Sequence, residues 1–198
     1  MVMTGPPAHF ATDILREWRD RPERFADLFD AYHGDIYRYA ASRLSVGHAD
    51  DVAAETFLVA FHERARFAGP AEHVRAWLYG IATNLIRRHR RDEERRYRAF
   101  GRIDGTDRTH GDDQDDRVVA RVAAVGVRQE LAVALASLKP ADRDVLLLVA
   151  LGELSYAEVA VALGIAEGTV ASRLNRARKI VRAALGGVDP THDETGAP

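Results

Sequence analysis

The sequence predicts an all-α protein of two small helical domains joined by a flexible acidic linker, with a helix-turn-helix in the second domain. Apolar residues recur at helical spacing through most of the chain, and no alternating strand pattern of useful length is present. Residues 104–116 lose this periodicity and contain six aspartates against one arginine, which is typical of a linker. Residues 155–179 carry the signals of two helices joined by a tight turn.

The periodic and non-periodic segments divide the 198 residues into five parts. A hydrophobic content of 46% is enough to build two small cores. The predicted parts are a flexible lead (residues 1–20), a first helical domain (21–98), the acidic linker (99–126), the helix-turn-helix domain (127–185) and a disordered tail (186–198).

Three helices are expected in the first domain. The opening helix has an apolar stripe that includes Phe25, Leu28 and Tyr32. Breaks at residues 45–47 and 68–70, both containing glycine, separate it from the second helix and the second from the third.

The second domain is expected to end in three helices, over residues 140–151, 155–163 and 167–184. Pro140 suits the first turn of the first of them, because proline lacks the N–H that would be unsatisfied there. Gly164 can adopt the left-handed conformation that ends the middle one.

The last two helices have the outline of a DNA-binding helix-turn-helix. Ser155 and Glu158 fit a capping box at the start of the first helix. The second helix has a face of short hydroxyl and long basic side chains, among them Thr169, Ser172 and Arg173, which suit phosphate anchoring and base contacts. The alternative is an ordinary amphipathic hairpin with a solvated arginine face.

The third helix of the first domain joins aromatic residues to a basic run. It begins near Trp77, and residues 87–98 carry seven arginines against three acidic residues. Single-stranded nucleic acid needs aromatic surfaces for its unstacked bases and cations for its backbone. The alternative is that Trp77 belongs to the core and that the arginines only confer solubility.

The second helix has an acidic face that includes Asp51, Glu55 and Leu58, opposite an apolar face that includes Phe57. An acidic stripe with one leucine could dock a basic protein surface. A plain solvated face is the alternative.

Composition excludes several classes of protein. The absence of cysteine excludes disulfides, thiolate zinc sites and cysteine nucleophiles. Without a long apolar run or a signal-peptide pattern, we expect a cytoplasmic protein with no membrane insertion. No phosphate-binding loop, paired histidine motif or catalytic triad is apparent, so we expect no enzyme, metal or cofactor; a helical enzyme is the rival from another class.

Five motifs in order give the chain a resemblance to a known family: they lie at residues 50–57, 77–84, 138–146, 155–160 and 168–178. Together they resemble the bacterial sigma factors of the extracytoplasmic-function (ECF) group, over about residues 22–98 and 127–184. The resemblance implies an initiation subunit that binds core RNA polymerase, directs it to specific promoters and assists promoter melting.

The family roles can be carried to this sequence motif by motif. The first domain would bind the β′ clamp and the −10 promoter element, and the second would bind the β flap and the −35 promoter element as duplex. An anti-sigma factor is a further implied partner, expected to wedge between the two domains while the flexible linker lets them clamp together. Polymerase contacts would come from Asp50, Asp51, Glu55 and Phe57; −10 contacts from His73, Trp77, Asn84, Arg87, Arg88, Arg90 and Arg91; and −35 contacts from Ser155, Thr169, Ser172, Arg173, Asn175, Arg176, Arg178 and Lys179.

Two positions depart from the family pattern. Ala171 stands where a basic residue is common, and Ala54 stands where glutamine is common. The alternative within DNA binding is a helix-turn-helix repressor or response-regulator output domain that binds duplex DNA without polymerase. It would explain residues 140–184 but neither the aromatic and basic helix nor the acidic face.

Overall fold

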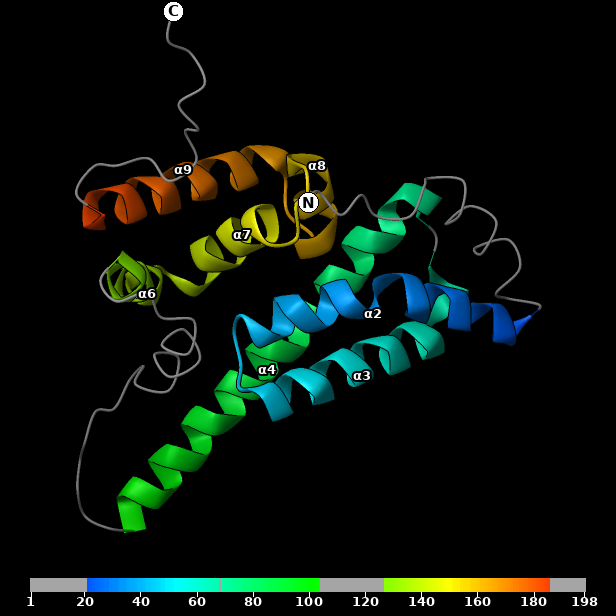
Figure 1. Cartoon of the computed structure of the whole chain (residues 1–198), viewed down its shortest axis with the longest axis horizontal. Helices are drawn as coiled ribbons and strands as arrows, with labels where there is room; N and C mark the ends of the chain where they lie inside the picture. Colours follow the sequence, from blue (N-terminus) through cyan, green and yellow to red (C-terminus); the bar gives the residue numbers. More distant parts are fainter. Residues whose placement is uncertain (1–20, 68, 104–126, 186–198) are drawn as a thin grey trace, which may run out of the picture.

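A computed structural model describes residues 21–67, 69–103 and 127–185 of the chain. The expected lead, the expected tail and residues 104–126 of the expected linker lie outside these ranges. All regular structure in the described ranges is helical, which confirms the all-α prediction (Figure 1). The helices of four residues or more are α2 (Phe25–Ala41), α3 (Val46–Glu63), α4 (Val74–Ile103), α6 (Val127–Ser137), α7 (Pro140–Ala150), α8 (Tyr156–Leu163) and α9 (Glu167–Ala184).

Helices α2, α3 and α4 form an N-terminal unit. Helices α2 and α3 lie side by side, and the long α4 crosses them (Figure 1). Leu28, Ile36 and Phe57 of α2 and α3 pack with Leu78 and Ile86 of α4 in the core. The short helices η1 (Pro22–Arg24), η2 (Arg64–Arg66) and η3 (Ala71–His73) complete the described part of this unit.

Helix α4 continues to Ile103 rather than ending at residue 98, so the expected linker begins too early at residue 99. The basic run contains good helix formers, and opposite charges recur at helical spacing. Arg95 Nη1 lies 3.6 Å from Asp92 Oδ1, and Arg88 Nε lies 4.0 Å from Asp92 Oδ2. These local pairs extend the helix beyond its apolar part.

The helix-turn-helix follows the capping signals in the sequence. The hydroxyl of Ser155 accepts a hydrogen bond from the Glu158 N–H at 3.3 Å, and the Ser155 N–H donates to Glu158 Oε2 at 2.8 Å. Gly164 ends α8 with a φ of 62°, in the left-handed region. The expected ranges of the last three helices are therefore confirmed within one residue at each boundary.

Helix α6 is held in the C-terminal unit, formed by α6 to α9, through a buried arginine. Arg143 Nε donates to the Leu135 carbonyl at 2.7 Å, and Arg143 Nη2 donates to the Ala136 carbonyl at 2.6 Å. These carbonyls lie in the last turn of α6, where they lack partners within the helix. A small apolar cluster that includes Ala134 and Val181 packs α6 against α9.

The two units are in direct contact and share one core. Tyr79 of α4 belongs to the same buried cluster as Leu148 of α7 and Val159 of α8. Helix α8 lies across α4, and a Cβ added to Gly80 would lie 2.4 Å from the carbonyl oxygen of Ala162. The sequence predicted two tethered domains but not this close packing.

Gly80→Ala is expected to lower the free energy of unfolding by about 1–3 kcal/mol, because the backbones of α4 and α8 must move apart. Gly168→Ala is the matched control, since a Cβ there meets nothing within 4 Å. That exchange should be neutral or stabilising by up to about 1 kcal/mol, from the helix propensity of alanine. Urea denaturation measures both, and equal effects would contradict the close approach.

Among the described residues, no helix is both long and apolar enough to cross a membrane.

Candidate nucleic-acid interface

Helix α9 presents one apolar face to the protein and a cationic face to solvent. Val170, Leu174 and Ala177 are buried against α6, α7 and α8. Residues 171–182 contain five basic residues and no acidic residue. Of the expected −35 contacts, all are exposed except Thr169 and Arg173, which are partly buried: Ser155, Ser172, Asn175, Arg176, Arg178 and Lys179.

An open groove runs along α9 beside α8. Its walls include the aromatic ring of Tyr156 on α8 and the side chains of Asn175, Arg178 and Lys179 on α9. Ala171 also lines it. The groove therefore combines an exposed ring, an amide and cations on one solvent-facing surface.

Arg176 is also tied to the protein itself. Its Nη1 lies 3.0 Å from both carboxylate oxygens of Asp142, a buried residue in the first turn of α7. The Arg176 side chain is 52% exposed, so the pair fixes α9 on α7 and leaves one edge of the guanidinium accessible. Arg173 has no such ion pair within the described residues.

The expected −10 residues separate into covered and accessible groups along α4. Trp77 is partly buried and packs against Phe67, with their ring centroids 4.9 Å apart. Asn84, Arg88 and Arg91 are exposed. His73, at the end of η3, is partly buried, as are Arg87 and Arg90.

Arg87 is covered because it binds the C-terminal unit. Its Nε lies 2.6 Å from Oδ2 of Asp144, a fully buried residue of α7. Arg43, in the turn between α2 and α3, pairs with the other carboxylate oxygen of Asp144. One buried carboxylate thus joins two cations of the N-terminal unit to the C-terminal unit.

A hydrogen-bond network supports this cluster. Arg43 Nη1 donates to the Tyr39 hydroxyl at 2.8 Å, and that hydroxyl lies 2.9 Å from the Thr83 hydroxyl on α4. Burial alone would lower the pKa of Arg43, but Tyr39 and Asp144 together raise it, so Arg43 stays charged. Burial raises the pKa of Tyr79 to about 12, so its hydroxyl stays neutral.

Sequence reasoning missed both Arg43 and Asp144. Helical spacing places Gly80, Asn84, Arg87 and Arg91 on one stripe of α4. Of these, Gly80 and Arg87 face the C-terminal unit. The available signal was the run of three charged residues at 142–144, immediately before the apolar segment of α7. A charged residue at the edge of a core segment is buried only if it is paired.

The acidic face of α3 has the exposure that the sequence predicted. Asp50, Asp51 and Glu55 are exposed, and Leu58 is 55% exposed between them and the end of the helix. Phe57 is buried instead, with its ring centroid 4.9 Å from that of Phe29. Phe57 therefore supports α3 from beneath and does not present its ring to a partner.

Comparison with known proteins matches each of the two units to a protein-family model. The family models for Sigma-70 region 2 and Sigma-70 region 4 match residues 28–96 and 128–181. The RNA polymerase sigma factor YlaC of Bacillus subtilis is 33% identical over 154 residues, which cover 77% of this chain and 86% of YlaC. The chain belongs to the sigma-70 family. It is a sigma factor, and the resemblance seen in the sequence is confirmed.

Relatives of this sigma factor carry the name of the ECF group. The ECF sigma factor SigL of Mycobacterium tuberculosis is 35% identical over 160 residues, covering 80% of this chain and 86% of SigL. SigW of Bacillus subtilis is 31% identical over 168 residues, covering 82% of this chain and 89% of SigW. The group implied by the sequence motifs is therefore confirmed.

Solved structures share the fold of this sigma factor. CnrH, in complex with the cytosolic domain of CnrY, is 25% identical with a TM-score of 0.60, and the match covers 90% of this chain and 96% of CnrH. RpoE of Bartonella quintana is 22% identical with a TM-score of 0.57, and this comparison supports the fold only.

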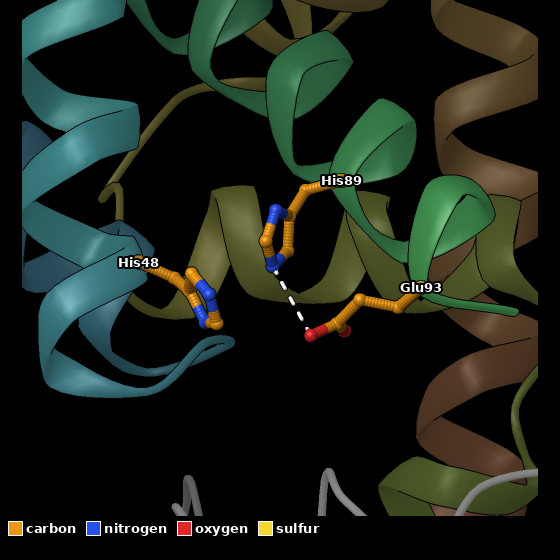
Figure 2. A group of neighbouring side chains, drawn as sticks. All are labelled: His48, His89 and Glu93. Carbon is orange, nitrogen blue, oxygen red and sulfur yellow. Dashed lines mark ion pairs between the residues drawn. The ribbon is translucent and has the colours of Figure 1, made fainter. Parts of the chain in front are cut away.

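One cluster of metal-ligating side chains occurs in the described part of the sigma factor, outside the surfaces above. It consists of His48 on α3 with His89 and Glu93 on α4 (Figure 2).

Proposed function

We propose that the two units of this sigma factor divide the work of initiation: the N-terminal unit binds polymerase and the melted −10 element, and the C-terminal unit binds the −35 element as duplex. The observation that supports this best is the exposed cationic face of α9 on a capped helix-turn-helix. The chain acts as a non-catalytic subunit in the cytoplasm, with promoter DNA and core RNA polymerase as its partners.

Polymerase is proposed to dock on the acidic face of α3. Asp50, Asp51 and Glu55 supply negative charge there, and the exposed Leu58 supplies an apolar contact. A basic partner surface, such as the β′ clamp, complements this combination. Phe57 contributes by holding the helix in place, and the C-terminal unit is proposed to bind the β flap.

The −10 element is proposed to bind along η3 and the first half of α4. Opening DNA costs stacking energy of about 1.4 kcal/mol per base-pair step. Stacking of an unpaired base on an aromatic side chain returns about 1–3 kcal/mol. Trp77 and His73 are the ring-bearing candidates at this end, while Asn84, Arg88 and Arg91 are the exposed polar groups that follow them.

The packed arrangement is proposed to be a resting form that opens when the sigma factor binds polymerase and promoter. In this arrangement Arg87 is bound to Asp144, and Gly80 is covered by α8. An anti-sigma factor would favour the packed form by binding across both units. CnrH, which is similar over 90% of this chain, was solved with a partner protein.

Reconstitution with core RNA polymerase tests this function directly. Core enzyme with the sigma factor should transcribe from a subset of promoters in a genomic library, and core enzyme alone should not. Tight duplex binding by the isolated protein as a dimer, with no transcript from any template, would favour a helix-turn-helix regulator instead.

Asn84→Ala is expected to impair open-complex formation more than closed-complex formation, because Asn84 is an exposed polar group on the proposed single-strand path. The loss of one base contact corresponds to about 1–3 kcal/mol, or about 5–150-fold. Permanganate reactivity of −10 thymines measures the opening. Glu130→Gln on α6 is the control, and equal thymine reactivity in all three proteins would contradict the role of Asn84.

A further inference from the structure

Three ligating side chains meet where the start of α3 approaches α4. His48 is in the first turn of α3, while His89 and Glu93 are one turn apart on α4. Figure 2 shows the three side chains converging on one point between the two helices. One ligand atom from each lies within 4.8 Å of the others.

The spacing on α4 fits a tetrahedral metal ion. Zinc bonds to histidine nitrogen and carboxylate oxygen are about 2.0–2.2 Å long, so two ligand atoms of a tetrahedron are separated by about 3.3–3.6 Å. His89 Nε2 and Glu93 Oε1 are 3.3 Å apart. A small rotation of the His48 side chain would complete the third corner.

His89 Nε2 itself lacks the partner that a buried nitrogen requires. The atom is shielded from solvent and has no hydrogen-bond partner in the described structure, because the nearby Glu93 oxygen is not in hydrogen-bonding geometry. A cation bound to both His89 Nε2 and the Glu93 carboxylate would give each of them a partner.

The surroundings of His48 also favour coordination. Ser45 Oγ lies 2.8 Å from His48 Nδ1, so a proton on Nδ1 can be donated to Ser45 while Nε2 keeps its lone pair. Histidines that bind a metal through one ring nitrogen usually donate the N–H of the other ring nitrogen in this way. Arg90 Nη2 donates to the Arg43 carbonyl at 3.1 Å, which ties α4 to the turn before α3.

We propose that His48, His89 and Glu93 form a binding site for a divalent transition-metal ion, with Zn²⁺ as the best match. Two imidazoles and one carboxylate without sulfur suit Zn²⁺, Co²⁺ and Ni²⁺ rather than Mg²⁺ or Ca²⁺. Three protein ligands leave the fourth position of the tetrahedron open for water, unlike structural zinc sites, where the protein supplies all four ligands. The ion fastens the start of α3 to the basic part of α4.

The location gives this site a structural consequence. Asp50 and Asp51, on the acidic face, lie within one turn of His48 on α3, and α4 carries Arg88 and Arg91 beside the ligands. A bound ion therefore fixes the position of the acidic face relative to the basic helix. The metal site rests on the three ligands alone and does not depend on the proposed roles in promoter binding.

Metal titration of the untagged, full-length protein tests the site. After treatment with chelator and dialysis, Zn²⁺ is titrated by calorimetry and Co²⁺ by visible absorption. We expect about one ion per chain, the intense bands of tetrahedral Co²⁺, and at least a tenfold loss of affinity in His89→Gln and in Glu93→Gln. Ser45→Ala, which keeps all three ligands, should weaken binding by about 10–100-fold.

His62→Gln is the matched control, because His62 is an exposed histidine at the other end of α3. It should bind Zn²⁺ as the wild-type protein does. The proposal is overturned if the wild-type protein takes up no Zn²⁺, or if His89→Gln, Glu93→Gln and His62→Gln all bind it with wild-type affinity. Circular dichroism of the metal-free variants establishes that each one is folded.

Discussion

Asp144→Asn is expected to loosen the contact between the two units and to lower the free energy of unfolding by about 3–5 kcal/mol. Asp144 is fully buried and holds Arg43, whose side chain is 2% exposed, together with Arg87. Asparagine keeps the size of the side chain but removes its charge. Arg43 then remains buried without a counter-charge, which is the costly outcome of breaking a buried ion pair.

Two measurements detect this change. Urea denaturation should give a lower midpoint and, if the units separate first, two transitions in place of one. Small-angle X-ray scattering should give a larger radius of gyration. Core-polymerase binding should not weaken, because Asp144 forms its ion pairs with Arg43 and Arg87 and not with the acidic face of α3.

Asp142→Asn is the matched control for Asp144→Asn. Asp142 is also a buried aspartate of α7, but its partner Arg176 belongs to the same unit. The Arg176 side chain is 52% exposed. Loss of the Asp142 charge should destabilise the C-terminal unit without changing the radius of gyration. Identical scattering from wild-type protein and Asp144→Asn would contradict the proposed link between the units.

Local signals predicted the helix-turn-helix accurately because each is contained within a few residues. The capping box of Ser155 and Glu158 spans one helical turn, and Gly164 needs only its own backbone conformation. The same holds for the exposed face of α3, since helical spacing alone separates Asp51 and Glu55 from the buried Phe57. Such features do not depend on how distant helices meet.

The contact between the units could not be predicted in this way. Arg43 and Asp144 are 101 residues apart in the sequence. Nothing near Arg43 indicates a carboxylate, and nothing near Gly80 indicates the backbone of α8. Helical spacing puts Gly80 and Arg87 on one stripe of α4, but spacing does not show which partner covers a stripe. The metal cluster was missed for the same reason, since His48 and His89 come from different helices.

Arg173→Ala is expected to weaken promoter binding by about 1–3 kcal/mol, or about 5–150-fold, and to relax the choice of base in the −35 element. Arg173 is partly exposed on α9 and, within the described residues, has no ion pair to hold it on the protein. It is therefore a clearer test than Arg176, whose loss would also remove the bond to Asp142.

Arg178→Ala separates base reading from phosphate binding. Arg178 lines the open groove beside Tyr156 and is exposed. If it binds phosphate, its loss should weaken all promoters equally and reduce the slope of log affinity against log salt by about one. Arg173→Ala should instead weaken the preferred −35 sequence most and leave mismatched sequences nearly unchanged.

Base reading and phosphate binding are distinguished by measuring the affinity of the holoenzyme at two salt concentrations. The two templates carry a preferred and a mismatched −35 element. The holoenzyme is the correct species to test, because the isolated sigma factor carries a net charge of −2 and holds Arg87 in the contact between its units. A base-reading role for Arg173 requires the two templates to respond differently. If Arg173→Ala lowered both affinities equally and changed the salt slope as Arg178→Ala does, Arg173 would be a phosphate contact and base recognition would have to come from the groove beside Tyr156.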